Sequence, residues 1–208
     1  MKTNPDNIIR PTLHHFGLTT ANLQAMKEWY GKVLGMAPIH ETAAPDGAAV
    51  LPPMQASWVT NDGADHRIAI MSLPRLTAAS DRSRHPRLQH VAFELPSIDA
   101  LLQTYTRLKA EGIEPVITAD HGATTAFYYE DPDRNSVELT IDNFGDWAKS
   151  SEFMRTSPEF AANPMGAYVD PEKMIAARDA GMTVEELHRR GYAGEFAPSK
   201  PMDPRVLI

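Results

Sequence analysis

The chain of 208 residues has no cysteine, and this absence excludes several kinds of chemistry at once. Without thiols the protein cannot form a disulfide, bind zinc through thiolates or use a cysteine nucleophile. A metal site in this chain must therefore be built from histidine and carboxylate side chains. The sequence has 8 histidines and 27 aspartates and glutamates to supply them.

Long apolar runs are also absent, and basic residues are few. A membrane-spanning helix needs roughly 20 apolar residues, whereas runs such as Ala48–Leu51 cover only a few. The first ten residues are polar and lack the apolar segment of a secretory signal. Lys and Arg number 20 against 27 Asp and Glu, a formal net charge of −7, which is unsuited to phosphate backbones. We therefore expect a cytoplasmic protein that binds neither membrane nor nucleic acid.

The length fits one large domain or two small ones, and the prolines indicate its subdivisions. Pro74 and Pro86 bracket a polar segment rich in Arg and Ser, and prolines are frequent again after about Phe144. We predict one compact domain with four parts: a first module over residues 10–74, a linker over 75–86, a second module over 87–144 and a C-terminal extension over 145–208.

A repeat with an offset of 75 residues links the two predicted modules. Leu13–Leu18 matches Leu88–Phe93, with leucine at positions 13 and 88 and histidine at positions 15 and 90. Two helix-like runs keep the same register, Leu23–Leu34 and Ile98–Lys109. An internal repeat of this kind determines architecture more firmly than local propensity does. The two halves are therefore expected to share one fold.

Each helix-like run is followed by strand-like segments that form a β-meander. In the second half these are Thr124–Glu130 and Ser136–Ile141, and in the first half Ser57–Thr60 and His66–Leu73. Both halves then correspond to a βαβββ module. We predict an α+β fold in which two tandem modules form one curved mixed sheet, with helices on one face and a C-terminal helical extension.

Strand alternation places His15, His90 and Glu138 on the face that the helices leave open, with Tyr128 as a further candidate. His14 has the opposite parity and is expected on the apolar side. A single strand histidine is more often structural. Two of them at repeat-equivalent positions, with a carboxylate of matching parity, instead favour a metal site inside the curve of the sheet. Two imidazoles and one carboxylate form the facial triad suited to non-haem Fe(II).

With these features the chain resembles the vicinal oxygen chelate superfamily, and within it the extradiol catechol dioxygenases of the biphenyl-2,3-diol 1,2-dioxygenase type. The resemblance covers about Leu13–Phe144. Its motifs are the histidine-bearing strand Leu88–Phe93 and three further segments. These segments are Asp65–Ile70, His121–Asp133 and Val137–Leu139.

The resemblance implies a role for each candidate side chain. It places Fe(II), with Mn(II) as an alternative, on the triad named above. It places His66 beside the oxygen site, as the acid needed when the O–O bond breaks, and it places His121 and Tyr128 at the oxygens of the catechol. The implied partners are a small aromatic diol and O2, and both oxygen atoms enter the product as the ring opens next to the diol. Such a reaction belongs to aromatic catabolism.

The chain departs from the family pattern in its turn and in its size. Arg134 stands where the Asp-Pro-Asp-Gly-Asn turn of the family usually has glycine, which questions the geometry of the hairpin before Glu138. Well-studied relatives often have four modules, whereas this chain has two. A two-module protein has a more open pocket, and we expect a homo-oligomer in which a partner subunit can supply a wall.

Two alternative functions remain open. One is another metal enzyme of the superfamily, such as a glyoxalase, an epimerase or a fosfomycin-modifying enzyme. The first two use a fourth ligand from the last strand of the first module, and Arg67–Leu73 contains no carboxylate, histidine or glutamine. The other alternative is a metal-free small-molecule binding protein of the bleomycin-resistance type, which would need no triad.

The extension has clear helix signals near its end. Asp170 before Pro171 predicts a short helix to about Ala180, and Thr183 with Glu186 predicts a second one. These helices could cover the pocket, pack on a second subunit or form a tail that is loosely attached to the rest of the fold. Three histidines have no predicted role and are expected to be solvated: His40, His85 and His188.

Overall fold

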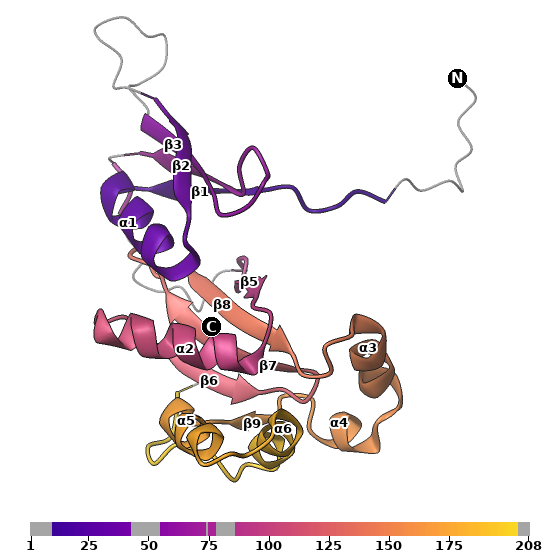
Figure 1. Cartoon of the computed structure of the whole chain (residues 1–208). Coiled ribbons are helices and arrows are strands. Elements are labelled where there is room, and N and C mark those ends of the chain that lie inside the picture. Colours follow the sequence, from indigo (N-terminus) through magenta and orange to yellow (C-terminus); the bar gives the residue numbers. More distant parts are fainter. Residues whose placement is uncertain (1–9, 43–54, 74, 78–85, 204–208) are drawn as a thin grey trace, which may run out of the picture. The chain divides into compact units, whose positions relative to one another are not determined.

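The computed structural model describes residues 10–42, 55–73, 75–77 and 86–203. It divides the chain into two compact units, residues 1–78 and 79–208, and each unit contains one βαβββ module (Figure 1). Most of the predicted linker, residues 78–85, lies outside the described residues. The expectation of a single compact domain stays a prediction.

The first unit is a four-stranded sheet with one helix. Its elements are β1 (Phe16–Thr20), α1 (Leu23–Leu34), β2 (Ala37–Glu41), β3 (Gln55–Thr60) and β4 (Ile68–Ser72). The strand order is β1-β4-β3-β2, in which β1 and β4 are parallel and the other pairs are antiparallel. The helix packs against β3 and β4.

Helix α1 has the predicted bounds because its two ends carry specific signals. Asn22 Oδ1 accepts a hydrogen bond from Ala25 N at 3.1 Å, and Gly35 ends the helix in the left-handed region with φ of 67°. The buried residues between them recur at helical spacing. They are Met26, Trp29, Tyr30 and Val33.

The second unit repeats this plan in a five-stranded sheet. Its module consists of β5 (Val91–Glu94), α2 (Ile98–Ala110), β6 (Ile117–Asp120), β7 (Thr124–Glu130) and β8 (Ser136–Asp142). The strand order is β5-β8-β7-β6-β9, where β9 (Ala167–Tyr168) comes from the C-terminal extension, and β5 and β8 are parallel. The first strand and the helix of this module begin 75 residues after those of the first module, as the repeat predicted.

The α+β class and the two βαβββ modules are therefore confirmed, but the described strands form two sheets instead of one. In each module the first strand pairs in parallel with the last strand, which joins the four strands of the module into one sheet. The sequence predicted one curved sheet, whereas each unit has a sheet of its own.

The extension contains more structure than its sequence signals indicated. Its elements are α3 (Trp147–Thr156), α4 (Pro158–Ala162), β9 (Ala167–Tyr168), α5 (Pro171–Asp179) and α6 (Val184–Tyr192). Asp170 and Thr183 cap α5 and α6 as predicted. The prediction of only two helices was wrong, because α3 and α4 precede them.

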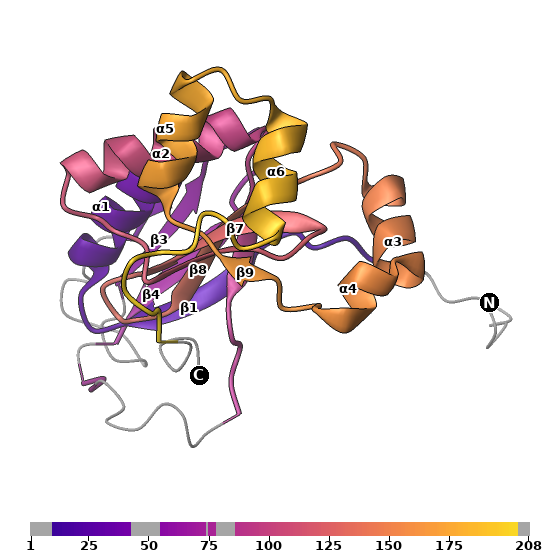
Figure 2. The ribbon, with the colours of Figure 1, turned by 90° about the horizontal axis from the view of Figure 1, so that it is seen from below.

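The extension packs on its own unit, so it is not a loose tail. Strand β9 pairs with β6 at the edge of the sheet, and α5 contacts α2. Helices α2, α5 and α6 lie over one face of the sheet (Figure 2). None of the helices in the described part of the chain is long and apolar enough to cross a membrane.

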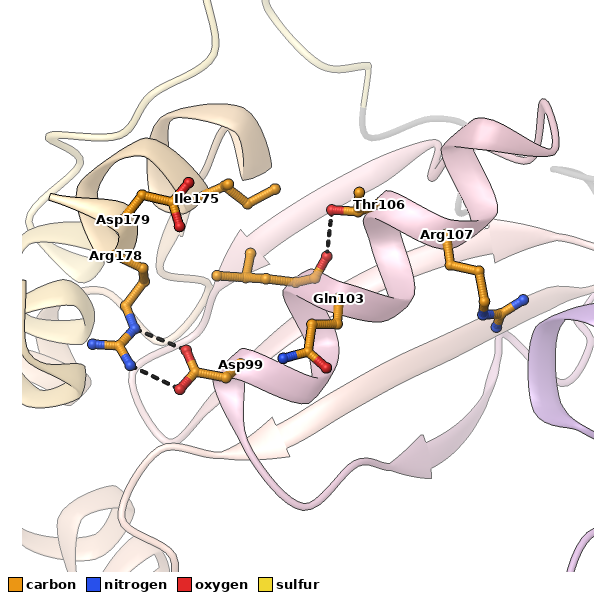
Figure 3. A pocket seen from close by; sticks show the side chains of 8 residues that line it. Asp99, Gln103, Thr106, Arg107, Ile175, Arg178 and Asp179 are labelled. Carbon is orange, nitrogen blue, oxygen red and sulfur yellow. Dashed lines mark hydrogen bonds and ion pairs between the residues drawn. The ribbon is translucent and has the colours of Figure 1, made fainter. Parts of the chain in front are cut away.

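A bidentate ion pair joins α5 to α2 (Figure 3). Arg178 Nε donates to Asp99 Oδ1 at 2.8 Å, and Arg178 Nη2 donates to Asp99 Oδ2 at 2.7 Å. A cavity of about 430 Å³ lies beside this pair between the two helices. None of the candidate site residues lines it.

We expect Asp99→Asn to lower the free energy of unfolding by about 1 kcal/mol at pH 7, because the pair is partly exposed and therefore screened. The hydrogen bond from Arg178 lowers the pKa of Asp99. The stabilisation is thus present above the ordinary carboxyl pKa of about 3.9 and is lost as the pH falls below it. Urea unfolding of both proteins at pH 7 and pH 3 measures this, and an equal difference at both pH values would contradict it.

Arg134 does occupy the turn position of glycine, with φ of 66°. The turn is held by Asp131, whose Oδ1 accepts from Asp133 N at 2.9 Å and from Asn135 N at 2.8 Å. Glu130 pairs with Ser136 directly beyond the turn, so the register of β7 and β8 is regular. The hairpin before Glu138 therefore has regular geometry, because the hydrogen bonds that Asp131 accepts hold the turn with Arg134 in the left-handed region.

Arg134→Gly is therefore expected to stabilise the protein by about 0.5–1 kcal/mol. Relief of left-handed strain contributes about 1–2 kcal/mol, and the greater freedom of glycine in the unfolded chain opposes it. Thermal and urea unfolding measure the change. Arg134→Ala serves as the control, since it removes the guanidinium and keeps the strain.

Candidate functional site

The second unit brings two of the predicted metal ligands together on the sheet face opposite α2. The register places Ala92 beside Glu138, Glu138 beside Tyr128, and Tyr128 beside Ile117, so these four side chains lie in one row. His90 precedes Ala92 by two residues. Its Nε2 lies 2.8 Å from Glu138 Oε2.

Burial and charge shape the properties of this row. Glu138 is 6% exposed, and the hydrogen bond that its carboxylate accepts from His90 raises the pKa of His90 against the opposing effect of burial. Burial raises the pKa of Tyr128 strongly, and the negative charge of Glu138 adds to the effect. Tyr128 therefore keeps its hydroxyl proton near neutral pH. Gln89 Oε1 contacts the other ring nitrogen of His90 and orients the imidazole.

The His90–Glu138 pair fits a divalent metal ion by its donor chemistry. Two ligand atoms bound at about 2.1 Å and at right angles to each other lie about 3 Å apart. The observed 2.8 Å between Nε2 and Oε2 is close to that spacing. A buried carboxylate also needs a compensating positive charge. Protonated His90 or a metal ion can supply that charge.

His121 extends the row at the end of β6 and contacts Tyr128. His121 Nε2 lies 3.1 Å from Tyr128 Oη, and His121 Nδ1 lies 2.8 Å from the carbonyl oxygen of Met165. A carbonyl only accepts, so Nδ1 carries the hydrogen. In the neutral imidazole Nε2 is then the acceptor, and Tyr128 donates its hydroxyl hydrogen to His121.

The first unit brings together the other two predicted residues, His15 and His66, and adds His14. The ring centroids of His15 and His66 are 4.2 Å apart, and His14 Nδ1 lies 2.9 Å from His15 Nδ1. The three imidazoles each offer one nitrogen within 4.8 Å of the others, a group that could hold a metal ion. Asp65 Oδ1 lies 3.3 Å from His66 Nδ1.

The structure differs from the sequence prediction at His14 and at His66. β1 begins at Phe16, so strand parity does not separate His14 from His15, which both precede it. His66 was expected within a strand, whereas β4 begins at Ile68. The assignment of His15 as a ligand with His90 and Glu138 stays a prediction, because His15 belongs to the other unit.

The first module has no counterpart of Glu138. Gly17 pairs with Ala69 in the first sheet, as Ala92 pairs with Glu138 in the second, and Gly17 and Ala92 are repeat equivalents. Ala69 therefore occupies the place of the carboxylate. This finding agrees with the absence of a fourth protein ligand, which glyoxalase and epimerase sites would need there.

His188, which was predicted to be solvated, has a specific partner. The side chain of His188 is 20% exposed, and its Nδ1 lies 2.8 Å from Oδ2 of Asp120, which is fully buried. The expectation for His188 was wrong because α6 packs beside β6. Neither residue had a local motif that could have indicated the pair.

Residues 12–139 match the model of a family described as the Glyoxalase/Bleomycin resistance protein/Dioxygenase superfamily. The match covers more than half of the chain, and it includes the first βαβββ module, the second module as far as Leu139 of β8, and all six candidate site residues. The chain therefore belongs to this superfamily.

Two relatives from Rhodococcus globerulus are similar over most of the chain. Biphenyl-2,3-diol 1,2-dioxygenase 2 is 33% identical over 199 residues, which cover 95% of this chain and 97% of that protein. Biphenyl-2,3-diol 1,2-dioxygenase 3 is 34% identical over 185 residues, which cover 89% and 91%. These similarities relate the chain to dioxygenases within the superfamily.

Among solved structures, a glyoxylase/bleomycin resistance protein/dioxygenase domain from Frankia sp. EAN1pec resembles this chain with a TM-score of 0.54. The alignment covers 64% of this chain and 93% of that domain at 16% identity. At this identity the similarity supports the fold alone.

Proposed function

We propose that the protein is an extradiol dioxygenase that opens the ring of a catechol-type substrate next to its two hydroxyl groups. In this proposal Fe(II) is held by His15, His90 and Glu138. The observation that carries it is the row on the second sheet, where His90 and Glu138 are paired and Tyr128 is hydrogen-bonded to His121 beside them. The similarity to two biphenyl-2,3-diol 1,2-dioxygenases supports the same substrate class.

A ferrous ion at these residues would supply Lewis acidity toward the diol and a route for electrons from the aromatic ring to O2. The side chains of the chain itself must then bind and orient the diol and move its protons. The hydrogen bonds of the second unit support a path for the first proton.

Tyr128 and His121 form a short relay for that proton. In this proposal Tyr128 Oη donates to His121 Nε2 and accepts a hydrogen bond from a diol hydroxyl. As the diol loses its proton to Tyr128 Oη, the phenolic hydrogen moves to His121 Nε2. The resulting imidazolium keeps its Nδ1 hydrogen on the carbonyl of Met165. Tyr128 remains a neutral phenol before and after the transfer.

His66 is proposed to deliver a proton later in the reaction, when the O–O bond breaks. Imidazole suits this task because it changes protonation near neutral pH. Asp65 Oδ1 accepts a hydrogen bond from the backbone N of His66 at 2.7 Å and lies 3.3 Å from His66 Nδ1, so in this proposal Nε2 is the atom that faces the reacting oxygen. Both atoms of O2 enter the ring-opened product, so no other reductant is required.

The test is an aerobic assay of protein that has been loaded with Fe(II) under anaerobic conditions. A panel from catechol to 2,3-dihydroxybiphenyl is followed by absorbance and by oxygen uptake. The expected result is a yellow ring-fission product with one O2 consumed per diol. Bound iron without colour or oxygen uptake across the panel would contradict the proposed reaction. Diol binding by a protein that takes up no iron would instead support the metal-free binding function.

A further inference from the structure

A buried carboxylate connects the C-terminal extension to the turn that carries His121. Asp120 is the last residue of β6, and none of its surface is exposed. Its Oδ1 accepts hydrogen bonds from Gly122 N at 2.9 Å and Asn143 Nδ2 at 3.2 Å, and its Oδ2 accepts one from His188 Nδ1 at 2.8 Å. A buried carboxylate is costly unless such donors compensate it, so each donor matters.

Two glycines allow the extension to approach Asp120 closely from two sides. A Cβ atom at Gly191 of α6 would lie 3.2 Å from Asp120 Oδ2. A Cβ atom at Gly166, which has φ of +72°, would lie 1.8 Å from the carbonyl oxygen of Asp120. The carboxylate is therefore enclosed by α6, and the main chain beside it is covered by the segment before β9.

The ring of His188 is held in place by aromatic neighbours. Its centroid lies 6.2 Å from that of Tyr192, which is stacked on it, and 6.0 Å from that of Phe144, which meets it edge to face. These contacts direct Nδ1 at Asp120. The hydrogen bond and the ring packing of His188 are thus two separable features.

The same carboxylate organises the turn in which His121 lies. Besides the bond from Gly122 to Asp120, His121 N donates to Thr124 O at 2.8 Å, and Asn143 Nδ2 donates to Gly122 O at 3.0 Å. The extension also supplies the carbonyl that receives the Nδ1 hydrogen of His121. The position and the tautomer of His121 therefore both depend on contacts with residues after position 144.

We propose that His188 and Asp120 are positioning residues, which hold His121 so that its Nε2 faces Tyr128 as a proton acceptor. His188 acts through the Asp120 carboxylate and does not touch the diol. This inference rests on the proposed function, in which His121 takes the proton that leaves the diol. It assigns to the extension a part in the reaction, beyond covering the sheet edge.

Two substitutions of His188 separate its hydrogen bond from its ring. His188→Asn keeps a donor, since Nδ2 of asparagine occupies nearly the place of Nδ1, and it removes the ring. His188→Phe keeps the ring against Tyr192 and Phe144 and removes the donor. A positioning role through Asp120 predicts that the asparagine variant resembles the unchanged protein and the phenylalanine variant does not.

The first readout is the tautomer of His121, measured without metal or substrate. Histidine is labelled with 15N, and two-bond proton–nitrogen spectra are recorded, with His121→Gln identifying the signals. We expect the hydrogen on Nδ1 in the unchanged protein and in His188→Asn. We expect shifted or mixed-tautomer signals in His188→Phe. A hydrogen on Nε2 in the unchanged protein would overturn the inference without reference to any variant.

The second readout is turnover of the diol by iron-loaded protein. His188→Phe is expected to lower kcat roughly tenfold with KM and iron content little changed, a loss of the size expected when a proton acceptor is slightly misplaced. His188→Asn is expected to stay within about twofold. Equal rates for His188→Phe and the unchanged protein, or an equal loss in both variants, would overturn the inference. If the unchanged protein shows the expected NMR pattern but does not turn over the diol, the proposed function is wrong. The positioning of His121 by His188 and Asp120 would still stand.

Discussion

Replacing Glu138 by glutamine is expected to abolish iron binding and diol turnover together. The glutamine keeps the volume of the side chain and removes the anionic oxygen that lies 2.8 Å from His90. Loss of an outer hydrogen bond at a metal site costs roughly 10–100-fold in affinity. Loss of a direct anionic ligand is therefore expected to cost more than about a hundredfold. Iron content after anaerobic loading and oxygen uptake with the diol measure the two effects.

The control is Glu94→Gln, because Glu94 is an exposed carboxylate of the same sheet whose partner is Trp147. It is expected to bind iron and turn over the diol normally. Full iron occupancy in Glu138→Gln or Glu138→Ala would contradict the assignment of Glu138 as a metal ligand. His90→Ala is expected to behave as Glu138→Ala does.

The same experiment on the first unit decides between two neighbouring histidines. His15→Ala is expected to abolish iron binding, whereas His14→Ala is expected to retain it. The two rings are in contact and equally available by strand position, so the pair is a matched comparison. The reverse result would exchange their roles.

His66→Phe is expected to keep iron and diol and to lose about 10²–10⁴-fold in rate. This is the usual contribution of a general acid, and phenylalanine retains the ring packing against His15 without a proton to donate. Anaerobic diol titration and single-turnover mixing with O2 separate binding from the chemical step. His40→Phe is the control, since His40 is an exposed histidine of β2 in the same unit.

Loss of iron in His66→Phe would indicate that His66 is itself a metal ligand. The imidazoles of His14, His15 and His66 would then form the metal site themselves, as their mutual proximity permits. A normal rate with full iron would show that another group delivers the proton.

The helices and strands of the modules could be predicted where end signals and periodicity agree. Leu23–Leu34 matches α1 at both ends because Asn22 caps it and Gly35 ends it. The missed elements give weak signals. Helix α3 buries only Ser150 in the structure, and β9 has two residues, too few to show alternation.

The candidate site was predictable to the extent that it follows from strand alternation. Tyr128 and Glu138 share a face because their strands pair in register. His188 and Asp120 are 68 residues apart, and their contact exists only once α6 packs beside β6. Nothing local in either segment indicates a partner, so this part of the site required the three-dimensional structure.

The short strand β9 also has a consequence for self-association. An unpaired strand edge can recruit another chain and start aggregation, and β6 would present such an edge if β9 were removed. The exposed strand β2 at the edge of the other sheet is interrupted by Pro38 and a register shift, which discourage the same event. A chain truncated after Phe144 would therefore be a poor substitute for the whole protein. It would lose the contacts that hold His121 and expose a hydrogen-bonding edge that favours insoluble oligomers.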